Sequence, residues 1–207
     1  MKPLVLSLTV VVAVIDWWSR ARHLPRVERW SKPLATIGVI GIALVSEAPG
    51  DQITVAVIAL TLCLIGDVAL MAPFDRFVVG LGAFLAAHLV FIVLFAKYGF
   101  DSAVAAGVAL IGAGLLIATV GAVIVRGATA HDRALRRPVL AYLCVICAMA
   151  AAGWATGLPW VVAGSTFFVV SDSILGWRRF VREQPWMNVA VMVTYHLAIG
   201  SLALSLW

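Results

Sequence analysis

Gly66-Asp67 and, after a short turn, Phe77-Val-Val-Gly-Leu-Gly-Ala-Phe-Leu-Ala-Ala-His88 place two ionisable side chains inside long apolar segments. Near the end of the chain, Val169-Val-Ser-Asp-Ser173 places another carboxyl group in a similar segment. A charged side chain inside a bilayer is costly, so such a residue usually marks a functional cavity. These stretches therefore predict a site within membrane-embedded helices.

The composition indicates a membrane protein. Of the 207 residues, 63% are hydrophobic and only 12% are charged, which leaves too little polar surface for a soluble globule. The apolar runs lack the alternation of barrel strands, so helices must satisfy the backbone in the bilayer. We predict an all-α fold, a polytopic transmembrane helical bundle that forms a single integral membrane domain over residues 1–207.

Apolar runs of about 20 residues, the length that crosses the hydrocarbon core, occur about eight times. The predicted spans cover residues 3–18, 33–48, 53–72, 77–96, 102–125, 138–156, 159–175 and 187–207.

The basic residues predict how the chain crosses the membrane. Of the 15 Lys and Arg residues, thirteen fall in the odd-numbered connections, which the positive-inside rule places in the cytoplasm. We expect a multi-pass cell-membrane protein with both termini outside the cytoplasm. Asp67 and Asp172 then lie near the cytoplasmic ends of their spans, with His88 and Tyr195 about halfway along theirs. Because orientation explains the basic residues, no nucleic-acid partner is predicted.

An internal repeat relates the two acidic segments. At an offset of 105 residues, Lys32-Pro33 aligns with Arg137-Pro138 and Asp67 aligns with Asp172. The offset predicts two halves, 1–105 and 106–207, that have the same orientation in the membrane and meet about an axis normal to it. Such a relation brings both carboxyl groups to a shared cavity.

The two carboxyl groups have two interpretations. Each forms an ion pair with an Arg of a neighbouring connection, such as Arg76 or Arg178, or the pair performs acid–base catalysis. A low-dielectric pocket favours the protonated form of a carboxyl group, so one acts as general acid while its partner stays ionised. Asp67 and Asp172 are therefore the candidate catalytic residues.

His88 is either a core histidine or a third catalytic candidate. Phe77, Phe84, His88, Phe91 and Phe95 follow helical spacing and form one face. Such a stripe suits ordinary packing, and it also suits an acyl or alkenyl chain beside a proton donor.

In the last span, Asn188 and Tyr195 are seven residues apart and share a face, whereas His196 points roughly 100° away. We therefore expect Tyr195 to line the cavity. Ser171 and Ser173 flank Asp172, and we expect them either to hydrogen-bond to the backbone or to orient its carboxylate. The predicted substrate-binding residues are thus Tyr195, Phe84, Phe91, Ser171 and Asn188. The sequence has no zinc pair of H-E-x-x-H type, no G-x-S-x-G elbow and no phosphate-binding glycine loop.

Several of these pieces resemble the YhhN family of integral membrane proteins, which includes the lysoplasmalogenases. The matching pieces are Lys32-Pro33, Gly66-Asp67 with Leu70-Met71, Phe77-x-x-Gly-Leu-x-Ala-Phe-x-x-Ala-His88, Phe168-x-x-Ser-Asp172-Ser-x-Leu175, and Tyr195 with Ala198. One departure is Ile199, where the family usually has Gln.

The resemblance implies a membrane hydrolase that cleaves the vinyl ether bond of a lysolipid into a fatty aldehyde and a glycerophospho-base. It implies Asp-based acid–base catalysis with His88 or Tyr195 as a relay, and no metal or organic cofactor. Two other functions fit the same features: a small proton-coupled transporter, because parallel repeats suit alternating access, and a non-catalytic lipid-binding membrane protein. Nothing in the sequence sets an oligomeric state.

Overall fold

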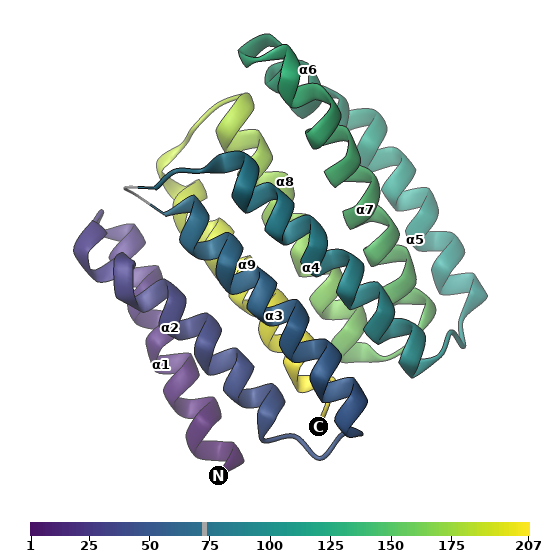
Figure 1. Ribbon diagram of the computed structural model, residues 1–207. Coiled ribbons are helices and arrows are strands. Elements are labelled where there is room, and N and C mark those ends of the chain that lie inside the picture. Colours follow the sequence, from purple (N-terminus) through teal and green to yellow (C-terminus); the bar gives the residue numbers. More distant parts are fainter. Residues whose placement is uncertain (72–73) are drawn as a thin grey trace.

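The computed structural model describes residues 1–71 and 74–207, and over these residues it is all-helical (Figure 1). The helices are α1 (Lys2–Ala21), α2 (Pro25–Leu44), α3 (Gly50–Leu70), α4 (Phe77–Tyr98), α5 (Ala103–Leu116), the π-helix η1 (Ile117–Gly121), α6 (Ala122–His131), the short 3-10 helix η2 (Arg133–Leu135), α7 (Arg136–Ala155), α8 (Pro159–Phe180) and α9 (Pro185–Leu204). The predicted all-α bundle is confirmed.

Seven helical segments in the described part of the chain are long and apolar enough to cross a membrane. One of them runs unbroken over Ala103–His131 through α5, η1 and α6, and so extends past the predicted end at residue 125. The eighth long helix, α2, carries four charged residues in its first half: Arg26, Glu28, Arg29 and Lys32. Both chain ends lie at the same end of the bundle (Figure 1).

The second helix begins at Pro25, eight residues before the predicted span. Pro25 occupies the first helical position, where its missing N–H costs nothing. Pro33 lies inside the helix, so the helix does not begin where the predicted span begins, although a proline is usually a helix boundary. The third span was predicted to reach Ala72, which lies outside the described residues; α3 ends at Leu70.

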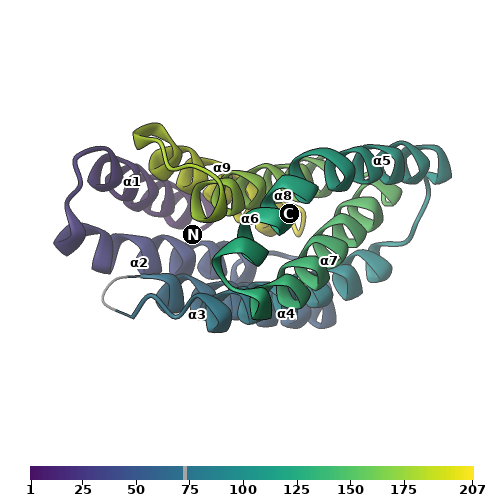
Figure 2. The ribbon, with the colours of Figure 1, turned by 90° about the horizontal axis from the view of Figure 1, so that it is seen from above.

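Seen from above, the helices form two layers, with α1, α9, α8 and α5 in one and α2, α3, α4 and α7 in the other (Figure 2). The core between the layers contains fully buried aromatic and aliphatic side chains, among them Phe91, Phe95, Phe168, Leu60 and Met149. The buried polar side chains described below lie within this core.

The neighbouring helices follow the pattern that a parallel repeat predicts. The contacts of α1 with α2, α2 with α3, and α3 with α4 correspond to those of α5 with α7, α7 with α8, and α8 with α9. Between the halves, α4 contacts α7 and, in the same relation, α9 contacts α2. The repeat of residues 1–105 and 106–207 stays a prediction that this arrangement supports.

Gly66 allows α3 and α4 to pack closely. A Cβ added at Gly66 meets the Phe84 ring at 2.5 Å, whereas a Cβ at Gly82 meets nothing within 4 Å. We expect Gly66→Ala to lower the free energy of unfolding by about 1–3 kcal/mol through overpacking. Gly82→Ala is the matched control, and chemical unfolding in detergent micelles measures both. Equal stability of the two variants would contradict the close packing.

Candidate functional site

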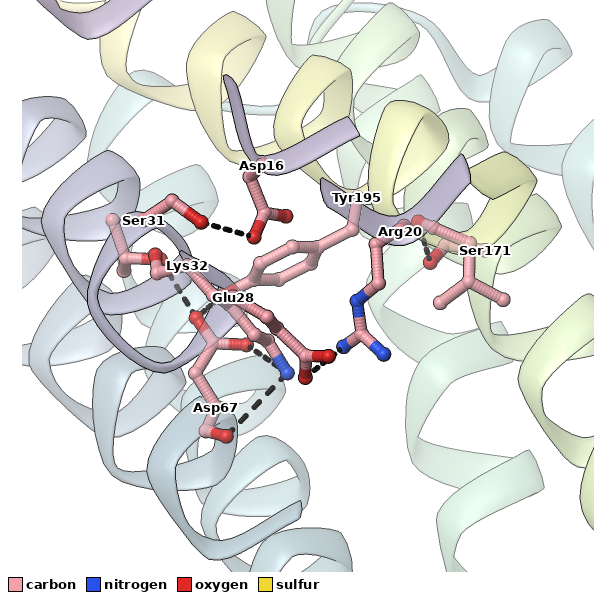
Figure 3. A network of polar contacts seen from close by, with 10 residues as sticks. Asp16, Arg20, Glu28, Ser31, Lys32, Asp67, Ser171 and Tyr195 are labelled. Carbon is pink, nitrogen blue, oxygen red and sulfur yellow. Dashed lines mark hydrogen bonds and ion pairs between the residues drawn. The ribbon is translucent and has the colours of Figure 1, made fainter. Parts of the chain in front are cut away.

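Asp67 lies in the last turn of α3 and is surrounded by donors from two other helices (Figure 3). Its Oδ2 atom accepts hydrogen bonds from Thr36 Oγ1 at 2.6 Å and from Tyr195 OH at 2.7 Å. Its Oδ1 atom lies 3.2 Å from Nζ of Lys32, and both side chains are buried. The negative charge of Asp67 is therefore balanced by Lys32 and fixed by two hydroxyl groups.

Lys32 was not among the predicted site residues. Hydropathy assigned it to a cytoplasmic connection, but α2 begins at Pro25, so Lys32 falls two turns inside the helix and is only 5% exposed. Its Nζ atom also lies 3.4 Å from the backbone oxygen of Asp67. The sequence signal was Lys32-Pro33, which carries part of the family resemblance. The predicted alternative, an ion pair of Asp67 with Arg76, is wrong because Lys32 is the partner.

Asp172 lies on α8 in a different environment. Its Oδ2 atom accepts a hydrogen bond from Tyr142 OH at 2.5 Å and lies 3.9 Å from Nε2 of His88, beyond hydrogen-bond distance. No Lys or Arg forms an ion pair with Asp172 within residues 1–71 and 74–207, and Arg178 instead donates to Asn188. Its side chain is 12% exposed. Asp172 thus keeps access to a cavity without a compensating cation.

Tyr142 is a second residue that the sequence reasoning missed. It lies on α7 within an apolar run and belongs to no motif, so only the fold shows that its hydroxyl reaches Asp172. His88 packs edge-to-face on Tyr142 and Phe168, with ring centroids 5.4 and 4.8 Å away. Both ring nitrogens of His88 are buried without a hydrogen-bond partner among the described residues.

Two adjoining cavities meet at Asp172. The apolar cavity lies between α4, α7 and α8, and its lining includes Phe77, Leu81, Phe84, Val139, Tyr142, Leu143, Ile146, Val169, Asp172 and Phe180. The polar cavity lies near the ends of α1, α3 and α8, and its lining includes Arg20, Lys32, Asp67, Phe84, Ser171, Asp172, Arg178, Asn188 and Tyr195. The two linings share Leu70, Phe84, Asp172 and Leu175. The carboxyl group of Asp172 therefore lies where an apolar space meets a polar one.

The predicted site residues divide into two groups. Asp67, Asp172, Tyr195, Phe84, Ser171 and Asn188 line the polar cavity. His88 and Phe91 line neither of the two cavities. His88 is 0% exposed and lies next to Asp172, whereas Phe91 packs in the core against Phe95 and Phe168. The helical face from Phe84 to Phe95 points inward as expected, but only its first part reaches a cavity.

Ser171 and Ile199 both take part in helix packing. The Ser171 hydroxyl donates to the backbone oxygen of Val191 at 3.1 Å, so of the two predicted roles it takes the backbone hydrogen bond, which ties α8 to α9. Ile199 is fully buried in the apolar core, and it is not among the residues that line either cavity.

The charges of the polar cavity leave one cation for a ligand. Arg20 is paired with Glu28 at 2.8 Å and Lys32 with Asp67, whereas Arg178 contacts only the neutral amide of Asn188 among the hydrogen bonds of the described chain. Arg178 is therefore the guanidinium best placed to attract an anion into this cavity.

Tyr195→Phe tests the hydrogen bonds around Asp67. Removal of the hydroxyl leaves the buried carboxylate with one donor fewer, and hydrogen bonds to charged groups contribute about 1.5–3 kcal/mol. We expect the free energy of unfolding in micelles to fall by that amount. Tyr98→Phe is the control, because the Tyr98 hydroxyl pairs with the neutral Ser205 hydroxyl rather than with a charged group. An unfolding free energy equal to that of the unchanged protein would show that the Tyr195 bond is unimportant.

Comparison with known proteins gives consistent matches. The model of the YhhN family matches residues 27–206. The chain is 29% identical over 164 residues to the lysoplasmalogenases of Mycobacterium bovis and Mycobacterium tuberculosis, covering 77% of this chain and 63% of each relative. It is 28% identical over 207 residues to the Homo sapiens lysoplasmalogenase TMEM86B, covering 99% of this chain and 85% of the relative.

The chain thus spans 63% of the length of the mycobacterial relatives. No solved structure matches it significantly.

Proposed function

Because this chain belongs to the YhhN family, whose model matches most of its length, we propose that it is a membrane-embedded hydrolase that cleaves the vinyl ether bond of a lysoplasmalogen. The relatives named lysoplasmalogenase support this substrate class. The observation that carries the proposal is the position of Asp172, which lines both the apolar and the polar cavity.

The two cavities suit the two parts of a lysolipid. The alkenyl chain occupies the apolar cavity against Phe77, Phe84 and Ile146, and the glycerophospho group occupies the polar cavity beside Arg178. In a lysoplasmalogen the vinyl ether joins these two parts. Placed in this way, it lies at the boundary of the cavities, beside the carboxyl group of Asp172.

A protonated Asp172 starts the reaction as general acid. Its proton goes to the vinyl carbon that is not bonded to oxygen, and the adjacent carbon becomes an oxocarbenium ion. Water adds to that ion and loses a proton to the Asp172 carboxylate, which gives a hemiacetal and restores the acid. Collapse of the hemiacetal releases the fatty aldehyde and the glycerol hydroxyl, so one water is consumed for each bond cleaved.

Asp67 and Tyr142 take supporting roles in this scheme. Asp67 pairs with Lys32 at 3.2 Å, and its carboxyl oxygens line the polar cavity, where they orient water toward the cationic intermediate. Tyr142 holds the Asp172 carboxyl group through its hydroxyl, and His88 packs behind the pair. Tyr142 and His88 are thus positioning residues, and Asp172 is the group that touches the reacting atoms.

An assay over matched lysolipids tests the proposal. Purified protein in lipid nanodiscs is given lysolipids with one head group whose chain is attached by a vinyl ether, a saturated ether or an ester. We expect stoichiometric aldehyde and glycerophospho-base from the vinyl ether only. Tight binding of all three lipids without product would favour a non-catalytic lipid-binding protein. Proton-dependent flux without turnover would favour a transporter.

Arg178→Gln tests the proposed head-group position. Loss of a charge-assisted contact to the phosphate is expected to raise the KM for lysoplasmalogen about tenfold and to change kcat little. Arg137→Gln, at an exposed position on α7, is the matched control. A vinyl ether substrate without phosphate should show no difference between the Arg178 variant and the unchanged protein. An equal rise in KM for both substrates would place the phosphate elsewhere.

A further inference from the structure

A separate groove lies between α1, α2 and α9 and shares no lining residue with the polar or the apolar cavity in the described part of the chain. Leu6 and Val10 of α1, Val39 and Ile42 of α2, and Leu204 of α9 form much of its wall. Neither the repeat nor the proposed hydrolysis uses this groove.

His196 is a buried polar side chain in the wall of the groove, whose lining also includes Thr9, Trp17 and Ser201. The side chain is buried, with 6% of its surface exposed, and Trp17 Nε1 donates a hydrogen bond to its Nδ1 atom at 2.9 Å. Because an indole N–H only donates, Nδ1 must accept, and the proton of the neutral imidazole then lies on Nε2. The buried Nε2 atom has no hydrogen-bond partner within residues 1–71 and 74–207. The groove therefore holds a buried donor without an acceptor.

The shape and charge of the groove define the class of ligand. No Lys, Arg, Asp or Glu is among its lining residues in the described chain, so the lining does not suit a charged head group. From His196 the groove follows α9 to Leu204, eight residues or about 12 Å along a helix. An occupant that satisfies both features is an uncharged aliphatic chain with one hydrogen-bond-accepting oxygen at its end.

We propose that this groove binds a long-chain fatty aldehyde, whose carbonyl oxygen accepts the hydrogen bond from Nε2–H of His196. The aldehyde is the apolar product of the proposed hydrolysis, so the identity of the occupant rests on the proposed function, whereas the donor and the groove do not. The aldehyde chain lies along α9 toward Leu204, beside α1 and α2. This site holds the product inside the protein but outside the cavities where it forms.

Photolabelling of the purified protein in nanodiscs tests the groove. The probes are a long-chain aldehyde with a diazirine in its chain and the matched alkane, and mass spectrometry locates the labelled peptides. We expect the aldehyde to label the α1 and α9 peptides at least fivefold more than the alkane does. Equal labelling of these peptides by the two probes overturns the proposal, whatever the hydrolytic activity.

Two variants assign the selectivity to the donor. His196→Phe keeps a ring but removes Nε2–H, so the preference for the aldehyde should disappear. His196→Gln offers an amide N–H at a similar distance, so this variant should retain most of the preference. Undiminished preference in His196→Phe overturns the assignment. Selective labelling without hydrolysis of lysoplasmalogen rejects the proposed function alone, whereas hydrolysis without selective labelling rejects the groove alone.

Discussion

Asp172→Asn is expected to slow aldehyde release from lysoplasmalogen by about 10²–10⁴-fold, the range that general acid–base catalysis typically contributes. The amide cannot deliver a proton to the vinyl carbon, and it cannot take one from water. Its oxygen still accepts the hydrogen bond from Tyr142, so the protein should remain folded. Initial rates measured in nanodiscs under saturating substrate provide the comparison.

Ser173→Ala is the matched control for this loss. Ser173 is the next residue of α8 and also lines the apolar cavity. Among the described residues, its hydroxyl donates only to the backbone oxygen of Val169 in its own helix. We expect activity within a few-fold of the unchanged protein. A folded Asp172→Asn protein that keeps most of its activity removes Asp172 from the mechanism.

Lys32→Met is expected to cost about 3–5 kcal/mol of unfolding free energy, the usual effect of removing one partner from a buried ion pair. The change leaves the Asp67 carboxylate buried with only the Thr36 and Tyr195 hydroxyls to stabilise its charge. Chemical unfolding in detergent micelles measures the loss. Lys97→Met is the control, because Lys97 and Asp51 form an exposed pair whose loss changes stability little.

The double variant Lys32→Met with Asp67→Asn separates charge from packing. Once both charges are removed, the amide oxygen at position 67 still accepts from the Thr36 and Tyr195 hydroxyls, and no uncompensated charge remains. We expect the double variant to recover most of the stability that Lys32→Met loses. A double variant as unstable as the single one would show that the methionine, rather than the buried charge, causes the damage.

Residue type and periodicity predicted most of the architecture, because apolar length alone defines helices in a bilayer. The exceptions are helices that contain charged residues next to their apolar runs. The first half of α2 reads as a basic loop, yet its backbone continues the helix through Pro33 and carries Lys32 into the core. The end of α6 was predicted too early for a similar reason. Arg126 indicated the start of a connection after residue 125, but the helix continues to His131.

The site could be predicted in part. Asp67, Asp172 and Tyr195 stand out as polar residues inside apolar runs, and the structure lines one cavity with all three. The partner of each carboxyl group depends on which helices are neighbours, so neither Lys32 nor Tyr142 followed from sequence spacing. His88 was predicted as a site residue because helical periodicity identified its buried face. Periodicity does not show whether that face reaches a cavity, and His88 is fully buried.

Proton delivery to carbon is the central claim, and hydrolysis in D2O tests it most directly. The reaction is run with the unchanged protein, and the aldehyde is trapped at once and analysed by mass spectrometry, with authentic aldehyde incubated in parallel to measure background exchange. We predict slower release than in H2O and one deuterium on the carbon next to the carbonyl. Aldehyde without deuterium at that carbon, released at an unchanged rate, would contradict protonation of the vinyl ether by Asp172.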